Sequence, residues 1–209
     1  LLAWLSIKYK TNQIVVGTVI NILATGLTSY ISARFVQVYQ NLNSPGTFPV
    51  WKIPFLADIP IIGPVFFQNS MFVYAMLILM FVIHFALFYT RWGLRVRAVG
   101  EHPKAADTLG INVFRTRYIS VLIGGLMAGL GGAFFTLGSV GRFDKLMTSG
   151  KGFIGLAAML FGNYTPFGSF GAGMFFGFAD SLGTRLSILS VPIPSDFLLM
   201  APYIATMIL

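Results

Sequence analysis

Long apolar segments are the feature that most limits what this chain can fold into. Three of them cover residues 13–33, 70–89 and 118–138. Each is about 20 residues long, which as a helix spans the roughly 30 Å hydrocarbon core of a bilayer. Only 10% of the residues are charged, against about a quarter in soluble domains. The sequence therefore predicts an all-α, polytopic transmembrane helical bundle.

Further apolar stretches extend this bundle toward the end of the chain. A short run covers residues 153–161, a Gly-Pro break follows at 162–168, another span covers 170–186, and a last span begins near residue 197. The chain begins and ends inside apolar runs, so we expect it to be a fragment, truncated at both ends, of a longer protein. We expect residues 1–209 to form a single transmembrane domain.

The segment between the first two spans, residues 37–69, is rich in proline. Proline fixes φ and removes a backbone donor, so a continuous helix is not expected there. Its aromatic and aliphatic side chains predict a loop at the extracytoplasmic surface of the membrane. The five prolines of this loop are Pro45, Pro49, Pro54, Pro60 and Pro64.

The densest cluster of charge lies between the second and third spans, in residues 91–117. An excess of basic residues in a short loop between two spans places that loop in the cytoplasm. The same distribution explains the net charge of +8 without a nucleic-acid partner. The loop holds six of the fourteen basic residues, Arg91, Arg95, Arg97, Lys104, Arg115 and Arg117.

A short helix is predicted inside this basic loop. Pro103 suits the first helical position, and Gly110 suits the left-handed position just past the end. Two turns are marginal alone in water, so the helix needs a surface, which its small apolar face of Ala105, Ala106 and Leu109 could contact. That surface is either the cytoplasmic end of the same protein or a groove on a cytoplasmic partner.

Several motifs give the chain a family resemblance. Residues 90–113 (TRWGLRVRAVGEHPKAADTLGINV), residues 150–168 (GKGFIGLAAMLFGNYTPFG) with 177–180 (GFAD), and residues 11–15 (TNQIV) stand in the expected order. They resemble the permeases of bacterial ABC importers for branched-chain amino acids, ribose-type sugars and nucleosides. The insert at 51–67 (WKIPFLADIPIIGPVFF) is most similar to the nucleoside branch. Asn163 departs from the basic or glycine residue that many members carry there.

The resemblance implies a fold, partners and a location. The chain would be the second half of a type II permease in the bacterial cytoplasmic membrane, multi-pass and without enzymatic activity, catalytic residues or a cofactor of its own. It would pair with a second permease subunit, as a heterodimer, with an ABC ATPase that holds ATP and Mg, and with a substrate-binding lipoprotein. The residues that would couple it to the ATPase are Glu101, Pro103, Ala105, Ala106, Leu109 and Gly110.

Two groups of side chains are candidates for the substrate pathway that this family implies. Asn21 and Thr25 belong to a polar stripe on the first span, and Phe134 and Phe135 lie at the end of the third. Hydroxyl, amide and aromatic groups suit a nucleoside, which offers a stackable base and a hydroxyl-rich sugar. The alternatives are hydrogen bonding between helices for the stripe and lipid or core packing for the rings.

Competing classes remain open on the sequence. A gradient-driven secondary transporter or facilitator would use Asp180 and His84, because a carboxyl inside a span is costly and so usually paired or functional. Alternatively Asp180 bonds to a neighbouring helix, and His84 is a packing residue. Within the family, a simple sugar is the alternative substrate. An intramembrane enzyme is disfavoured by the lack of H-E-x-x-H and G-x-S-x-G motifs, and no metal-ligand spacing or cysteine is present.

Overall fold

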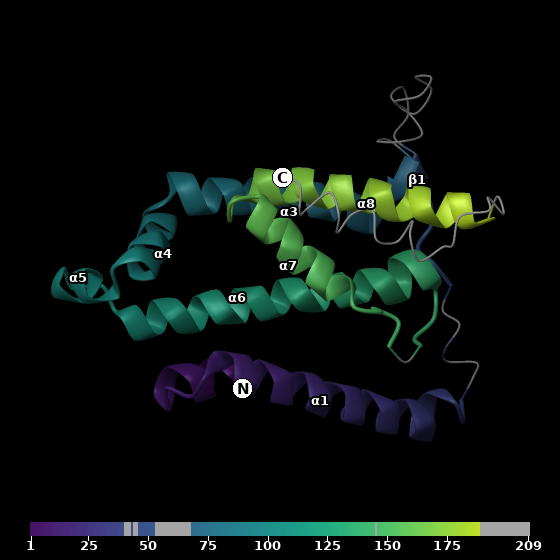
Figure 1. Cartoon of the computed structure of the whole chain (residues 1–209), viewed down its shortest axis with the longest axis horizontal. Coiled ribbons are helices and arrows are strands. Elements are labelled where there is room, and N and C mark those ends of the chain that lie inside the picture. The colour runs from purple at the N-terminus through teal and green to yellow at the C-terminus, as the bar shows by residue number, and fades with distance from the viewer. Residues whose placement is uncertain (40–42, 44–45, 53–67, 145, 189–209) are drawn as a thin grey trace. The chain divides into compact units, whose positions relative to one another are not determined.

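The computed structural model describes residues 1–39, 43, 46–52, 68–144 and 146–188, and it is mostly helical (Figure 1). The chain divides into two compact units, residues 1–149 and 150–209. The last predicted span, from residue 197, and residues 53–67 of the proline-rich loop lie outside the described residues. The all-α prediction is confirmed apart from one short two-stranded ribbon.

Three helical segments of the first unit match the three long apolar runs. They are α1 (Gln13–Ile31) with its π-helical extension η2 (Ser32–Val36), α3 (Met71–Tyr89), and α6 (Val113–Ala133) with its extension η4 (Phe134–Val140). Among the described residues, these are the helices both long and apolar enough to cross a membrane. Their axes run in similar directions in Figure 1, as spans through one bilayer would.

Asparagine caps fix where two of these helices begin. The Asn12 side-chain oxygen accepts a hydrogen bond from the Ile14 amide at 2.9 Å, and that of Asn112 accepts one from the Arg115 amide at 2.8 Å. Each cap satisfies one of the amides left without a partner in the first turn. Because of the second cap, α6 begins five residues before the predicted start at 118, so Arg115 and Arg117 belong to the helix and not to the loop.

Two short strands pair within the described part of the proline-rich segment. Strands β1 (Val50–Lys52) and β2 (Gln68–Ser70) pair antiparallel across it, with Trp51 opposite Asn69. Earlier in the segment, the side-chain amide of Asn43 bonds to the backbone of Phe143. Its nitrogen donates to the Phe143 carbonyl at 3.0 Å, and its oxygen accepts from the Phe143 backbone amide at 2.8 Å. The described parts of this loop are therefore anchored to the chain that follows η4.

The second unit contains α7 (Lys151–Phe161) and α8 (Pro166–Ile188), joined by a tight turn. A side chain at Gly162 would place its Cβ 2.1 Å from the Ser169 amide nitrogen, so only glycine allows the two helices to approach so closely. Asn163 has a φ of 49°, in the left-handed region that asparagine tolerates. The departure from the family pattern at this position therefore suits the turn.

Helix α8 starts four residues before the predicted span at 170. Thr165 precedes it, and its hydroxyl accepts a hydrogen bond from the Gly168 amide at 3.2 Å. Pro166 occupies the first helical position, where its missing amide costs nothing. The 23 residues of α8 are enough to cross a bilayer, yet this helix is not among the three that combine length with high apolarity.

Candidate functional site

The loop predicted at 91–117 contains a helix that the sequence analysis missed, α4 (Arg91–Glu101). The Thr90 hydroxyl serves both helices at the corner with α3: it donates to the Ala86 carbonyl and accepts from the Gly93 amide. A Cβ at Gly93 would lie 2.2 Å from the Leu87 carbonyl oxygen. The corner therefore depends on a threonine and a glycine three positions apart.

Helix α5 (Pro103–Thr108) is the short helix that the sequence predicted, and it follows α4 after one residue. Its end is closed by two backbone bonds, from the Ile111 amide to the Ala106 carbonyl at 3.1 Å and from the Gly110 amide to the Asp107 carbonyl at 2.9 Å. Gly110 is left-handed, with a φ of 78°. This bond pair with a left-handed glycine is the Schellman motif, so the predicted stop is confirmed.

The predicted apolar face of α5 is wrong as a single surface. Ala106 is 2% exposed and Leu109 is 81% exposed. Ala106 is buried within its own chain, where α5 adjoins α4 and α6. Ile111, whose amide bonds to the Ala106 carbonyl, has a half-buried side chain. Ala105 is exposed together with Leu109, so these two residues are free to meet another molecule.

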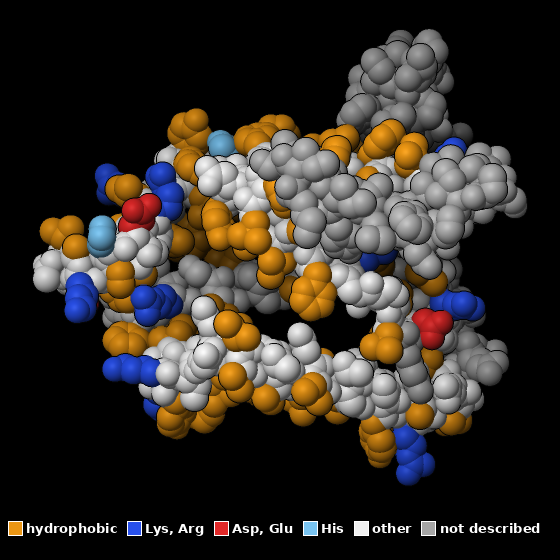
Figure 2. Space-filling model, in the orientation of Figure 1, with side chains coloured by type: hydrophobic (Ala, Val, Ile, Leu, Met, Phe, Trp, Pro, Cys, Tyr) orange, Lys and Arg blue, Asp and Glu red, His pale blue; other side chains and the backbone are white. Residues whose placement is uncertain are grey.

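The other residues assigned to coupling surround this stub. Glu101 ends α4 and is exposed, Pro103 is half-buried at the start of α5, and Gly110 is exposed at its end. Figure 2 shows Lys and Arg side chains gathered at the end of the molecule that carries α4 and α5. Arg97 of α4 lies 4.9 Å from the centre of the Phe88 ring and ties α4 to α3.

The residues assigned to the substrate pathway belong to two groups on different helices. On α1, the Thr25 hydroxyl donates to the Asn21 carbonyl at 2.8 Å, so it is satisfied within its own helix, and both side chains are exposed. Phe134 lies 6.2 Å from Phe72 and 5.9 Å from Phe135, ring centre to ring centre. Within the part of the chain that the structure describes, no hydrogen bond or ring contact joins the two groups.

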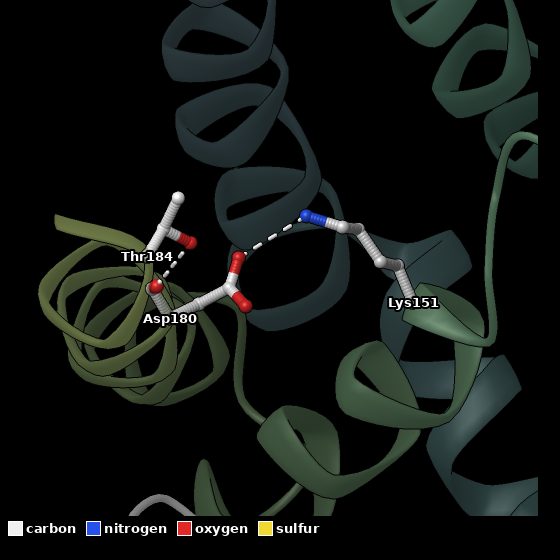
Figure 3. Close-up of polar contacts among 3 residues, drawn as sticks. All are labelled: Lys151, Asp180 and Thr184. Carbon is white, nitrogen blue, oxygen red and sulfur yellow. Dashed lines mark hydrogen bonds and ion pairs between the residues drawn. The ribbon is translucent and has the colours of Figure 1, made fainter. Parts of the chain in front are cut away.

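Asp180 has a partner on the neighbouring helix. Its carboxylate lies 3.1 Å from the Lys151 ammonium, and the two side chains are 39% and 47% exposed (Figure 3). Lys151 opens α7, whereas Asp180 lies in α8. The alternative in which Asp180 bonds to a neighbouring helix is therefore confirmed, with a basic partner that the sequence analysis did not identify because it is 29 positions away.

His84 lies among aromatic rings. Its ring centre is 4.9 Å from that of Phe88 and 6.0 Å from that of Tyr89. Among the residues that the structure covers, no group of three or more His, Cys, Asp or Glu side chains could hold a metal ion. The geometry agrees with a packing histidine.

Comparison with known proteins assigns a context to this geometry. The family described as the permease component of the branched-chain amino acid transport system matches residues 1–207. The guanosine ABC transporter permease protein NupQ of Bacillus subtilis is 45% identical over 206 residues, which are 97% of this chain and 65% of the relative. The nucleoside ABC transporter permease protein NupC of Lactococcus lactis is 40% identical over 207 residues, again 97% and 65%.

A third relative differs in its named substrate. It is a putative glucose ABC transporter permease protein of Haloferax volcanii, 35% identical over 189 residues, which are 90% of this chain and 57% of the relative. The chain thus spans about two thirds or less of the length of these relatives. No solved structure matches it.

Proposed function

The chain belongs to the family of branched-chain amino acid transport system permease components, and from this premise we propose that it acts as the transmembrane permease subunit of an ATP-driven nucleoside importer. The observation that carries the proposal is α5. It is a short stub that begins at a proline and is closed at its C-terminal end by two backbone bonds, and it exposes Ala105 and Leu109 beyond the ends of α3 and α6. Such a stub can fit a groove on an ATPase and transmit its motion.

The mechanical route from α5 to the spans is short. Helix α4 connects α5 to the corner at Thr90 and Gly93, and therefore to α3. Asn112 caps α6 immediately after the Schellman motif, so α5 also leads directly into the third span. Movement of α5 by closure of two ATPases would tilt α3 and α6 together, because neither connection contains a long flexible segment.

The proposed partners follow from the same premise. They are an ABC ATPase that binds ATP and Mg, a second permease subunit, and an external binding lipoprotein that supplies the substrate. Nucleosides are the preferred substrate class because the two relatives at 45% and 40% identity are named for guanosine and nucleosides. Simple sugars are the second candidate, because of the relative named for glucose at 35% identity.

The orientation of α5 is tested by single-cysteine labelling. The chain has no cysteine, so Lys104→Cys and Leu146→Cys each introduce one reactive thiol, on α5 and after η4 respectively. We expect a membrane-impermeant maleimide applied to intact cells to label residue 146 and not residue 104. Labelling of residue 104 from outside would remove the ATPase groove as its partner and end the proposal.

The coupling role is tested by Leu109→Asp in the complete importer. The side chain is 81% exposed, so the change leaves the fold of this chain intact while placing a charge in the groove. We expect at least a tenfold loss of both nucleoside uptake and substrate-stimulated ATP hydrolysis. The control is Leu146→Asp, which is 72% exposed and lies after η4. Full coupled activity of Leu109→Asp would show that α5 is not the contact.

The substrate class is tested separately, by competition. Uptake of labelled guanosine by cells that express the importer should fall with excess adenosine or uridine and should be unchanged by excess glucose or ribose. The reverse pattern would move the assignment to simple sugars and leave the permease role untouched.

A further inference from the structure

A cavity of about 500 Å³ lies in the first unit, apart from the residues already assigned to coupling or to the substrate pathway. It is an open cavity lined by the start of the chain around η1 (Trp4–Lys8), by α4 and by the first turns of α6. Cavities of about 300–1,000 Å³ hold small-molecule ligands. Its walls are mainly apolar and include Leu2, Ala3, Val96, Val99 and Val121.

The cavity lies at the level where the spans begin. Gln13, the first residue of α1, lines it, and so do Thr116, Arg117, Ser120 and Val121 of a helix that starts at Val113. By the distribution of basic residues this end faces the cytoplasm. The cavity is therefore at the depth of the lipid headgroups and upper acyl chains of the inner leaflet.

Its polar lining offers donors and a positive charge. The Ser6 hydroxyl oxygen is buried and, among the described residues, has no hydrogen-bond partner. Arg117, an exposed residue, also lines the cavity, and no carboxylate of the described chain pairs with its guanidinium. The hydroxyls of Thr116 and Ser120 already donate to the carbonyls of Asn112 and Thr116, at 2.9 and 3.0 Å. The groups left open thus match a ligand that accepts hydrogen bonds and is negatively charged.

The charges around the cavity favour the same ligand. Four basic residues are adjacent in sequence to lining residues, and one acidic residue, Glu101, is adjacent to the lining Gly100. Basic pockets between helices on the cytoplasmic side of a membrane bind anionic lipid headgroups. The four basic residues are Lys8, Arg95, Arg97 and Arg115.

We infer that this cavity binds an anionic phospholipid of the inner leaflet. Arg117 and Ser6 bind the phosphate oxygens, and the glycerol and upper acyl chain cover Val96 and Val121, which are partly exposed. A free phosphate would leave these apolar walls uncovered, and a neutral nucleoside would gain nothing from the arginine. The inference uses the cytoplasmic location of this end but not the identity of the transported substrate.

A bound lipid at this place would stabilise α4. Val99 is 3% exposed and lines the cavity from the last turn of α4, two residues before that helix ends. Helix α5 begins two residues beyond Glu101, so the lipid fills the space behind the helix that carries the coupling stub. The site is therefore placed to set the position of α5 relative to the membrane.

Native mass spectrometry of the complete purified importer, reconstituted with phosphatidylglycerol or phosphatidylcholine, tests the inference. We expect one phosphatidylglycerol per copy of this chain to survive delipidation, and Arg117→Gln to weaken its retention about fivefold, the factor expected for one basic residue near anionic lipid. Arg115→Gln, two residues earlier on the same helix, is the matched control: Arg115 is exposed, as Arg117 is, but does not line the cavity, so its loss should weaken retention less. Val96→Phe, which fills the cavity, should abolish retention.

Four results would overturn the inference. Equal loss in Arg117→Gln and Arg115→Gln would indicate general surface attraction. Equal retention of phosphatidylcholine would remove the role of charge, and displacement of the lipid by millimolar inorganic phosphate or by nucleoside would assign the cavity to those ligands. Absence of retained lipid in the full-length protein would mean that another part of the protein fills the cavity. None of these results bears on uptake, which the assays of the proposed function measure separately.

Discussion

The corner formed by α4 and α5 buries side chains within its own chain, whereas the three spans of the first unit leave almost all of theirs unburied. The corner buries Gly93, Val99 and Ala106 within its own chain. By contrast, α3 and α6 bury no residue at all, and α1 buries only Val16. A helix apolar all round is stable when lipid or other helices cover it.

This difference separates two kinds of surface. The corner acts as a self-contained part whose shape is set by caps, glycines and one buried alanine. The spans display apolar side chains along their length, and they include small residues such as Gly125 and Gly129, where an added Cβ would meet no atom within 4 Å. Small residues four apart allow close helix contact in a membrane, so these faces suit lipid or partner helices.

The sharpest test of this contrast is a charge placed on the buried side of α5. Ala106→Arg puts a guanidinium at a position that is 2% exposed, and a buried charge without a partner costs about 3–5 kcal/mol. We expect α5 to detach, which hydrogen exchange would record as amide exchange in residues 103–111 faster by a factor on the order of 100. Uptake should be lost as well.

The neighbouring position supplies the control for that substitution. Ala105→Arg changes the same residue type in the same helix but at an exposed position, so exchange should stay as in the unmodified protein. If both variants show the same amide exchange in residues 103–111, α5 is not held by packing within its own chain, and the contrast with the spans is wrong. The two variants also separate folding from docking, because Ala105→Arg impairs ATP coupling only if the exposed side meets the ATPase.

The second test concerns the approach of α4 to α3. Gly93→Ala would place its Cβ 2.2 Å from the Leu87 carbonyl oxygen, so the backbone must move. We expect a loss of about 1–3 kcal/mol in the stability of the corner, the usual range for overpacking, seen as faster exchange in residues 86–100. Gly100→Ala, in the same helix with no atom within 4 Å, should be neutral or slightly stabilising.

The same contrast explains which parts could be predicted from the sequence. The spans could be predicted from runs of about 20 apolar residues, and α5 from Pro103 and Gly110. These signals are local in the sequence. Helix α4 was missed because arginines between two spans are typical of a loop, and its start depends on one hydroxyl that serves two helices. The burial of Ala106 and the pairing of Lys151 with Asp180 are tertiary facts that no local pattern carries.

A third test addresses the stop of α5. Gly110 has a φ of 78°, where a side chain costs roughly 1–2 kcal/mol. Gly110→Ala should therefore raise exchange at the amides of residues 110 and 111 about tenfold, because the two Schellman bonds open. Gly110→Asn is the matched variant and should have a smaller effect, because asparagine tolerates this conformation. Identical exchange in Gly110→Ala and the unmodified protein would show that the stub does not need its cap.

The smallest effect on stability is expected in the second unit, from loss of the ion pair between Lys151 and Asp180. Like most side chains of the three spans, this pair is not buried within its own chain. Both side chains are more than a third exposed, and exposed pairs contribute about 0.2–1 kcal/mol. The packing of α7 on α8 rests instead on Phe161 against Phe176, 5.9 Å between ring centres. Asp180→Asn should therefore lower the midpoint of thermal unfolding only slightly and leave ATP-driven uptake intact.

The control is Phe176→Ala, which removes a ring that is almost fully buried and should lower the midpoint of thermal unfolding far more. An Asp180→Asn variant that abolishes uptake while keeping its thermal stability would give the carboxylate a role in transport and revive the gradient-driven alternative.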